Sequence, residues 1–385
     1  MSEVPERYVE LGLRLGRHID GLVDAYFGPE EIAERVAEEG LREPADLARD
    51  AAALVEESPH EWLRAQLVGL ETVARRLAGE DVPFAEEVER CYGVRPKRVP
   101  ENRFEAAHRA LEEVLPGDGS LAERYQAWRE TDTLSGDALA RVTDSLADDL
   151  RSRTEKLVGL PEGESVHFEY VTDEPWSAYN YYLGELHSKI AVNTDVPLTP
   201  TFLIELVAHE TYPGHHTEHS WKERLLYRDD GRLEESILMI GTPHSLVSEG
   251  IASLAPEMAL GGEEQRVVAD HVRDTGVSYD PELSRSVRDA ARPLEGVGTN
   301  VAFLLHEDDR PEEEAREYIK RWGLSSDRRA DQALRFISNP VWRSYITTYT
   351  DGYRVCKAFV NGDPARFRRL LTEQLTPADL QAPSS

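Results

Sequence analysis

The residues best suited to chemistry lie in one short stretch, from Val207 to His219. It reads Val-Ala-His-Glu-Thr-Tyr-Pro-Gly-His-His-Thr-Glu-His and holds four of the twelve histidines of the chain. Zinc favours imidazole and carboxylate ligands, and a His-Glu pair on a helix is typical of metallopeptidases. There the histidine binds the metal and the glutamate activates a zinc-bound water. We therefore predict a zinc ion bound by His209, with Glu210 as the catalytic base.

The second histidine of such a motif normally follows four residues after the first, and here Pro213 takes that place. On a straight helix His209 and His215 would lie about 9 Å apart along the axis and on different faces, so they could not share a zinc ion. Proline breaks a helix, and Gly214 adds backbone freedom. We predict that Pro213 and Gly214 bulge outward as a two-residue insertion. His215 then becomes the second ligand, with His216 as the alternative.

A competing motif lies in the same stretch. His215, Glu218 and His219 fit the inverted pattern H-x-x-E-H, in which the two histidines are one helical turn apart and Glu218 would be the base. This arrangement needs no bulge, but it leaves the Pro-Gly break and the His209-Glu210 pair unexplained. A histidine-rich helix end that binds nothing is the third interpretation.

A catalytic zinc site needs a third protein ligand besides the water. Glu249, 39 residues after Glu210, is our candidate on a second helix, and Gly250 beside it would allow close helix packing. A solvated surface glutamate is the alternative interpretation of Glu249. Other carboxylates nearby in sequence are Glu234, Glu235 and Glu257.

A zinc hydrolase also needs a hydrogen-bond donor for the developing oxyanion. Candidates are Tyr345, Tyr349, Arg343 and His306, of which we carry Tyr349 and His306 forward as catalytic residues. Tyrosines at every fourth position are also what a buried helix stripe would show, and a histidine at a helix end can be purely structural.

Hydrophobic periodicity predicts a mainly α fold, with a small β-sheet beside the active-site helix. Alternating residues at 166–171 and 186–192 predict strands, and a strand at 185–193 could bind an extended peptide along its edge. A helix should begin at Thr199-Pro200. The predicted helices are 5–27, 43–57, 59–78, 103–115, 134–159, 200–227, 234–260, 263–275, 280–307, 311–322, 327–338, 340–360 and 363–373.

The change of pattern near residue 160 suggests two regions. Residues 1–160 form an N-terminal helical region, and residues 161–385 form a helical catalytic region with the small sheet and the zinc motif. The two regions could also be one continuous fold.

Composition bears on partners and location. The chain has 73 acidic and 44 basic residues, a formal charge of −29, which disfavours nucleic acid and anionic membranes as partners. Only six of the bases are lysines, and this acidic composition predicts a halophilic source whose salt screens the repulsion. Cys91 and Cys356 offer no disulfide framework. The first residues lack the features of a secretory signal, and no apolar run is long enough to span a membrane, so we expect a cytoplasmic protein.

The motifs resemble those of the domain of unknown function 885 family, zincin-type metallopeptidases of bacteria and archaea that carry HExxPGHH and then a Glu-Gly-Trp-Ala-like segment. The first motif matches at His209, Glu210, Pro213, Gly214, His215 and His216, and the second at Glu249, Gly250 and Ala252. Ile251 stands where the family has tryptophan. The aromatic, glycine-containing helix around Tyr345, Tyr349 and Gly352 and the segment Ala191–Asp195 are also similar, so the resemblance covers most of the chain. It implies a mainly helical zincin-like fold, one zinc ion and peptidase activity.

The leading hypothesis is a zinc-dependent metallopeptidase that hydrolyses short peptides. The alternatives are a catalytically inactive zincin-like protein that binds metal or peptide, and a metal-dependent hydrolase of non-peptide amides. Cleavage preference and oligomeric state stay open.

The charge leads to a prediction about salt. If −29 reflects adaptation to molar salt, the unfolding temperature should rise steeply with KCl up to the molar range, where the Debye length is about 3 Å. Thermal unfolding followed by circular dichroism at increasing KCl measures this. A flat or falling curve would refute the halophilic source and leave the peptidase hypothesis untouched.

Overall fold

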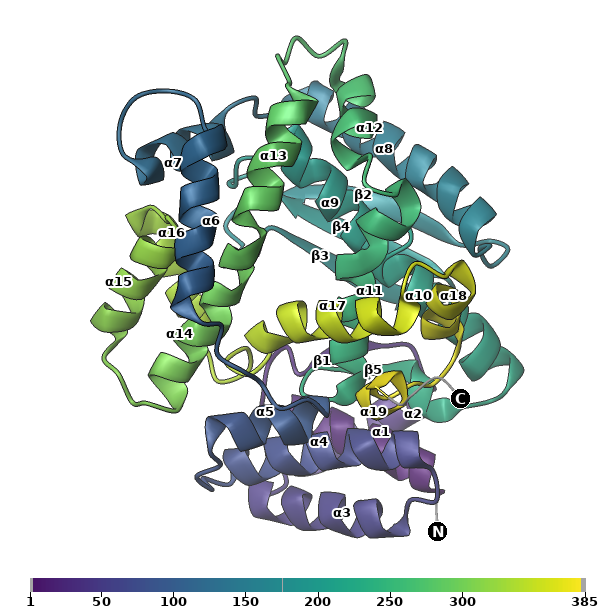
Figure 1. Cartoon of the computed structure of the whole chain (residues 1–385). Coiled ribbons are helices and arrows are strands. Elements are labelled where there is room, and N and C mark those ends of the chain that lie inside the picture. The colour runs from purple at the N-terminus through teal and green to yellow at the C-terminus, as the bar shows by residue number, and fades with distance from the viewer. Residues whose placement is uncertain (1–2, 175, 382–385) are drawn as a thin grey trace.

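The computed structural model describes residues 3–174 and 176–381, and these residues form a mainly helical fold with two small sheets (Figure 1). The strands are β1 (Val23–Tyr26), β2 (Ser165–Val171), β3 (Ala178–Gly184), β4 (His187–Asn193) and β5 (Ile237–Met239). The α-helices are α1 (Val4–Gly16), α2 (Glu30–Glu38), α3 (Pro44–Glu57), α4 (Glu61–Leu77), α5 (Phe84–Tyr92), α6 (Glu101–Val114), α7 (Leu121–Glu130), α8 (Gly136–Leu157), α9 (Pro200–Glu210), α10 (His215–Lys222), α11 (Pro243–Leu260), α12 (Glu264–Val272), α13 (Pro281–Ala291), α14 (Val297–His306), α15 (Glu312–Trp322), α16 (Asp327–Ser338), α17 (Ile346–Val360), α18 (Pro364–Thr372) and α19 (Pro377–Gln381). Short irregular helices are η1 (Glu223–Asp229), η2 (Leu233–Ser236) and η3 (Arg292–Gly296).

Helix α17 crosses the middle of the molecule in Figure 1, with α1–α5 below it and the sheet of β2, β3 and β4 above. Each of three large hydrophobic clusters draws residues from both sides of residue 160. Phe84 packs in one cluster with Leu246, Leu146 in a second with Ile204, and Leu15 in a third with Ile237. Hydrophobic packing therefore continues across residue 160, and the division into two regions stays a prediction.

Most predicted elements are present, although α2, α5, α7 and β3 have no counterpart among the predictions. Two predicted helices are wrong in part, and both errors have the same cause. The predicted helix 5–27 is wrong beyond Gly16, because Val23–Tyr26 instead pair with β5 in an antiparallel ladder. The predicted helix 234–260 is likewise wrong at its start, where η2 and β5 precede α11. A partner more than 200 residues away in sequence decides the structure at both places, and local periodicity carries no sign of it.

The main sheet has the order β2-β4-β3, with β2 parallel and β3 antiparallel to β4. The predicted strands at 166–171 and 186–192 are confirmed as β2 and β4. The proposed edge role of 185–193 is wrong, because β4 lies in the middle of the sheet and its backbone pairs on both sides. The edge strand nearest the histidine motif is β3, whose Tyr-rich sequence gives no clear alternation.

Two glycines set the approach of α11 to α17. A Cβ atom added at Gly250 would lie 2.5 Å from the carbonyl oxygen of Gly352, and one added at Gly352 would lie 2.5 Å from that of Leu246. The predicted close packing at Gly250 is therefore confirmed. It brings the tyrosines at the start of α17 against Glu249 on α11.

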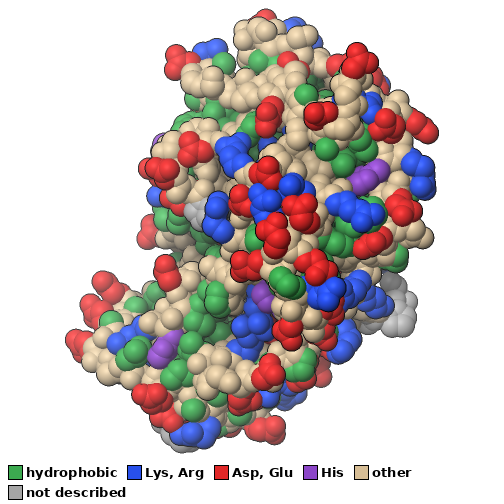
Figure 2. Space-filling model, turned by 90° about the vertical axis from the view of Figure 1, so that its left-hand side faces the viewer, with side chains coloured by type: hydrophobic (Ala, Val, Ile, Leu, Met, Phe, Trp, Pro, Cys, Tyr) green, Lys and Arg blue, Asp and Glu red, His purple; other side chains and the backbone are tan. Residues whose placement is uncertain are grey.

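The surface is strongly acidic, as the composition requires. Figure 2 looks onto the side on which α7, α15 and α16 lie in Figure 1, and acidic side chains are spread over this whole face with basic ones between them. No helix within the described ranges combines the length and apolar character needed to cross a membrane.

The helix contact generates a stability prediction. Gly250→Ala should lower the free energy of unfolding by about 1–3 kcal/mol, because the new methyl group meets backbone atoms that cannot move independently. Gly40→Ala is the matched control, since a Cβ atom at Gly40 meets nothing within 4 Å, and it should change stability by less than about 0.5 kcal/mol. Urea unfolding at fixed salt measures both. Equal stabilities of the two variants would contradict the glycine contact.

Candidate metal centre

The histidine motif is a helix interrupted by a two-residue excursion. Thr199 caps α9 by accepting a hydrogen bond from the Phe202 N–H, and the helix ends at Glu210. The N–H of Gly214 then donates to the carbonyl of Ala208, at 3.1 Å. In a regular helix that carbonyl would accept from the residue four positions on, not six. Two residues are thus looped out, as predicted, and α10 resumes at His215 in the position that normally follows four residues after His209.

Glycine is required at position 214, where the backbone returns to the end of α9. A Cβ atom at Gly214 would lie 1.9 Å from the carbonyl oxygen of His209 and 2.5 Å from that of Ala208. No side chain fits this approach, so the Pro-Gly pair has two separate roles. Pro213 cannot continue the helix, and Gly214 lets the chain close again on α9.

The excursion brings three side chains from three helices together. His209, His215 and Glu249 each offer a ligand atom, and these atoms all lie within 4.8 Å of one another. Nε2 of His209 and Nε2 of His215 are each 3.6 Å from an oxygen of Glu249, and the two imidazole centroids are 4.7 Å apart. Two tetrahedral zinc ligands with bonds of about 2.1 Å are separated by about 3.4 Å, so this donor set fits a zinc ion.

One buried oxygen of the cluster lacks a hydrogen-bond partner. Glu249 is buried, and its Oε2 has no hydrogen-bond partner among the described residues. A buried carboxylate oxygen without a partner is costly, and a cation would satisfy it. The His209 side chain is 22 % exposed against 5 % for Glu249, so the cluster opens to solvent on the His209 side.

The two histidines differ in proton affinity. Burial lowers the pKa of His209 to about 4, so its imidazole is neutral and able to bind a metal at neutral pH. Burial also acts to lower the pKa of His215, but Glu249 outweighs it and raises that pKa to about 9. A metal ion would have to displace this proton, which couples metal binding to proton release.

Glu210 has the properties of a base. Its carboxylate forms no hydrogen bond or ion pair with any residue that the structure describes, although its backbone carbonyl accepts from Nδ2 of Asn180 at 2.7 Å. Burial raises the pKa of Glu210 to about 7, and the charge of Glu249 contributes in the same direction. A carboxyl with a pKa near neutrality can both accept and return a proton.

Two tyrosines of the C-terminal part lie beside the cluster. The Tyr345 hydroxyl donates to Oε1 of Glu249 and so fixes that carboxylate. The Tyr349 ring packs edge-on against Tyr345 with centroids 5.7 Å apart, and it is 37 % exposed. Partial burial and the charges of Glu249 and Glu210 hold the pKa of Tyr349 well above its usual value, so the phenol stays a donor.

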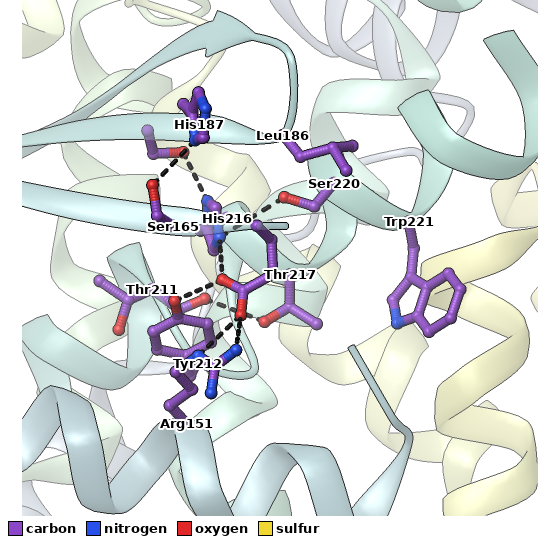
Figure 3. A network of polar contacts seen from close by, with 12 residues as sticks. Arg151, Ser165, Leu186, His187, Thr211, Tyr212, His216, Thr217, Ser220 and Trp221 are labelled. Atoms are coloured by element: carbon purple, nitrogen blue, oxygen red, sulfur yellow. Dashed lines mark hydrogen bonds and ion pairs between the residues drawn. The ribbon is translucent and has the colours of Figure 1, made fainter. Parts of the chain in front are cut away.

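His216, the alternative second ligand, is committed elsewhere. Its Nε2 lies 2.9 Å from Oε2 of Glu164 and its Nδ1 lies 2.8 Å from Oγ of Ser188. Glu164 also accepts from Tyr212 and pairs with Arg151. Figure 3 shows the His216 ring inside this network, with Tyr212 and Arg151 below it. Both ring nitrogens are used, so the network anchors the first turn of α10, and His215 is the histidine that stays available to a metal.

The inverted motif is also assembled, because His215, Glu218 and His219 have ligand atoms within 4.8 Å of one another. However, Oε1 of Glu218 lies 2.6 Å from Nζ of Lys222 and 3.3 Å from Nε2 of His244. A buried ammonium repels a metal ion and neutralises the glutamate that would have to act as the base. The charges therefore favour the site built on His209.

Other candidates lie outside the cluster. The structure does not bring His306 to it: Nε2 of His306 lies 2.9 Å from the Ile337 carbonyl, and its ring packs on Phe84. We correct the assignment of His306 to a helix-end side chain whose hydrogen bond joins α14 to α16. Glu257 pairs with Lys357, while Glu234 and Glu235 share the side chain of Gln374.

Sequence reasoning missed Asp24 and Tyr179. Asp24 lies at a bulge of β1 and accepts a hydrogen bond from the Tyr179 hydroxyl on β3. Burial raises the pKa of Asp24, and the charges of His215 and Glu249 also act on it. The sequence around Asp24 resembles a helix and does not indicate that Asp24 lies near the histidine cluster. Only the pairing of β1 with β5 places it there.

Comparisons with known proteins bear on the fold. No family model and no curated protein matches the sequence. Among solved structures, a proposed lipoprotein of Colwellia psychrerythraea is similar at a TM-score of 0.55 and 16 % identity, over 91 % of this chain and 64 % of its own. A proposed lipoprotein of unknown function from Shewanella oneidensis is similar at 0.52 and 13 % identity, over 91 % of this chain and 69 % of its own. These likenesses concern the fold alone.

The two overlapping triads can be separated by metal binding. The protein should bind one zinc ion, and His209→Ala should weaken binding by more than about 100-fold, the upper range for losing even an outer partner of a metal ligand. His219→Ala should leave binding within a few fold, because His219 belongs only to the inverted motif. Competition with a chromogenic chelator measures both affinities. The reverse order of effects would assign the site to His215, Glu218 and His219.

Proposed function

We propose that this chain is a zinc-dependent metallopeptidase that hydrolyses short peptides, with a zincin-like site on α9, α10 and α11. The observation that carries the proposal is the convergence of His209, His215 and Glu249 within 4.8 Å, beside the unpaired carboxylate of Glu210. The resemblance to the domain of unknown function 885 family supports the same activity.

His209, His215 and Glu249 would hold the ion. A zinc ion bound there would supply a Lewis acid that polarises the scissile carbonyl and lowers the pKa of water. The nearby positive charge would also lower the pKa of Glu210 from its metal-free value of about 7, so that the carboxylate is ionised and ready to act.

Glu210 carries the proton through the reaction. Its carboxylate takes a proton from the attacking water as the new C–O bond forms at the peptide carbonyl. The resulting carboxylic acid then gives that proton to the leaving nitrogen as the C–N bond breaks. The hydrogen bond from Asn180 to the Glu210 backbone fixes the end of α9 and hence the direction of this side chain.

The two tyrosines divide the remaining tasks. Tyr345 gives its hydroxyl to Glu249 and so orients a ligand. Tyr349 is left with a partly exposed phenol near Glu210 and Glu249, and it would donate to the oxyanion that develops on the scissile carbonyl.

The test of this function is Glu210→Gln. The amide cannot accept the proton, so hydrolysis should fall by at least about 100-fold, the lower range for general acid–base catalysis, while zinc affinity stays the same. Digestion of a mixed-peptide pool followed by mass spectrometry measures turnover, and a chelator assay measures zinc. Glu257→Gln on α11 is the matched control, because that carboxylate pairs with Lys357 outside the cluster.

Each other outcome selects an alternative. Zinc binding without peptide hydrolysis in the unaltered protein would favour a metal- or peptide-binding protein. Zinc-dependent hydrolysis of non-peptide amides alone would favour the amide hydrolase. Unchanged turnover in the Glu210→Gln variant would remove Glu210 from the mechanism.

A further inference from the structure

A second feature of the fold is a cavity of about 540 Å³ next to α9, the helix that carries His209. Its walls come from α7, α9, α13, η3, α14 and α16, and its lining includes Phe202 and Glu205 of α9 and Ser177 beside β3. Its volume lies in the range of small-ligand pockets. No residue proposed to bind zinc or to catalyse hydrolysis lines it.

Arginine is the dominant charge of this cavity. Arg129, Arg288, Arg292 and Arg329 line it, against the two carboxylates of Glu205 and Glu295. Four positive charges against two negative ones leave a net charge of two positive, in a chain whose net charge is −29. A concentration of arginine of this kind in so acidic a protein points to an anionic ligand.

Three of the four guanidinium groups form no ion pair among the described residues. Within residues 3–174 and 176–381, Arg129, Arg292 and Arg329 form no ion pair, whereas Arg288 pairs with Glu205. Arg129 lies over the Tyr125 ring at 5.5 Å and Arg292 over the Tyr353 ring at 5.2 Å, which positions both groups by stacking.

Arg329 is the arginine of the four whose charge is least well stabilised. Its Nε is buried and has no hydrogen-bond partner in the described parts of the chain. Burial, together with the charge of Arg129, lowers the pKa of Arg329 to about 10. An arginine that is partly desolvated and repelled by a neighbour is stabilised by a bound carboxylate, which accepts two parallel hydrogen bonds from the guanidinium fork.

The cavity lies within reach of the proposed zinc site. Glu205, whose partner is Arg288, precedes His209 by four residues on the same face of α9, so the two are about 6 Å apart along the axis. An extended peptide spans about 3.3–3.6 Å per residue. Two extended residues therefore span the axial separation between His209 and the part of α9 that lines the cavity.

We propose that the arginine-lined cavity binds the free C-terminal carboxylate of the substrate, so that the enzyme is a carboxypeptidase that releases short C-terminal fragments. This inference rests on the proposed peptidase function. Each turnover consumes one water: the C–N bond breaks, the N-terminal product gains a carboxylate, and the released fragment gains an amine. Arg329 is the principal donor to the carboxylate, and Arg129 and Arg292 add positive charge.

Matched peptides test the inference. One pentapeptide without acidic side chains is made as the free acid and as the C-terminal amide, and a third peptide is an amide with glutamate at its last position. The free acid should be cleaved with a kcat/KM about 10- to 100-fold above the simple amide, the range for a hydrogen bond to a charged group. Arg329→Gln should remove most of this preference, and Arg329→Lys should restore part of it. Arg335→Gln, on the same helix but outside the cavity, should leave it unchanged.

A binding measurement separates this inference from the function on which it rests. Calorimetry with the Glu210→Gln variant should show tighter binding of the free acid than of the amide, and most of this difference should be lost when Arg329 is also replaced by Gln. Such binding without any turnover by the unaltered protein would refute the peptidase and keep the carboxylate site. Equal binding and cleavage of acid and amide would overturn the inference while hydrolysis stands. Equal cleavage of the free acid and the glutamate-ended amide would assign the cavity to acidic side chains, and the assignment to the chain end would then be wrong.

Discussion

The candidate site depends on the return of the backbone at Gly214. The hydrogen bond from its N–H to the carbonyl of Ala208 closes a loop of two extra residues, so the helix direction continues while the phase of the side chains is reset. Without that closure His215 would point about 240° around the axis from His209. The buried contacts of His216 with Glu164 and Ser188 then fix the first turn of α10 in the new phase. The helix break at Pro213 is thus stabilised on both sides, by the Gly214–Ala208 hydrogen bond toward α9 and by the contacts of His216 in α10.

The rest of the site is assembled by contacts between distant segments. Glu249 reaches the histidines from α11, and α11 is fixed by its close contact with α17 at Gly250 and Gly352. The same contact places Tyr345 within hydrogen-bonding distance of Glu249. Orientation of a ligand by an outer hydrogen bond is a general property of metal sites, and here it comes from a helix about 100 residues further along the chain.

The sequence was informative wherever the chemistry was local. The His-Glu pair, the Pro-Gly break and the His-His that follows lie within eight residues, so helical geometry alone was enough to predict the two-residue insertion and to favour His215. Glu249 could be proposed as the third ligand because it is followed by Gly250, a residue that allows two helices to pack closely. The place of Asp24 could not be predicted, because it depends on the pairing of β1 with β5, more than 200 residues away. The edge position of β3 could not be predicted because it depends on β2 pairing with β4 rather than with β3, the next strand in sequence. His306 was misassigned because a histidine at a helix end looks the same in sequence whether it faces a site or a backbone carbonyl.

The pairing of β1 with β5 has a consequence for synthesis of the chain. Strand β1 ends at Tyr26, and its partner begins only at Ile237. At a translation rate of about 5–20 residues per second, the first strand leaves the ribosome roughly 10 to 40 s before its partner exists. During that interval α1 lacks Ile237 and Met239, which complete its hydrophobic cluster. The N-terminal segment therefore exposes apolar side chains until β5 is made. The high net negative charge of the chain opposes aggregation during this time, because like-charged chains repel one another.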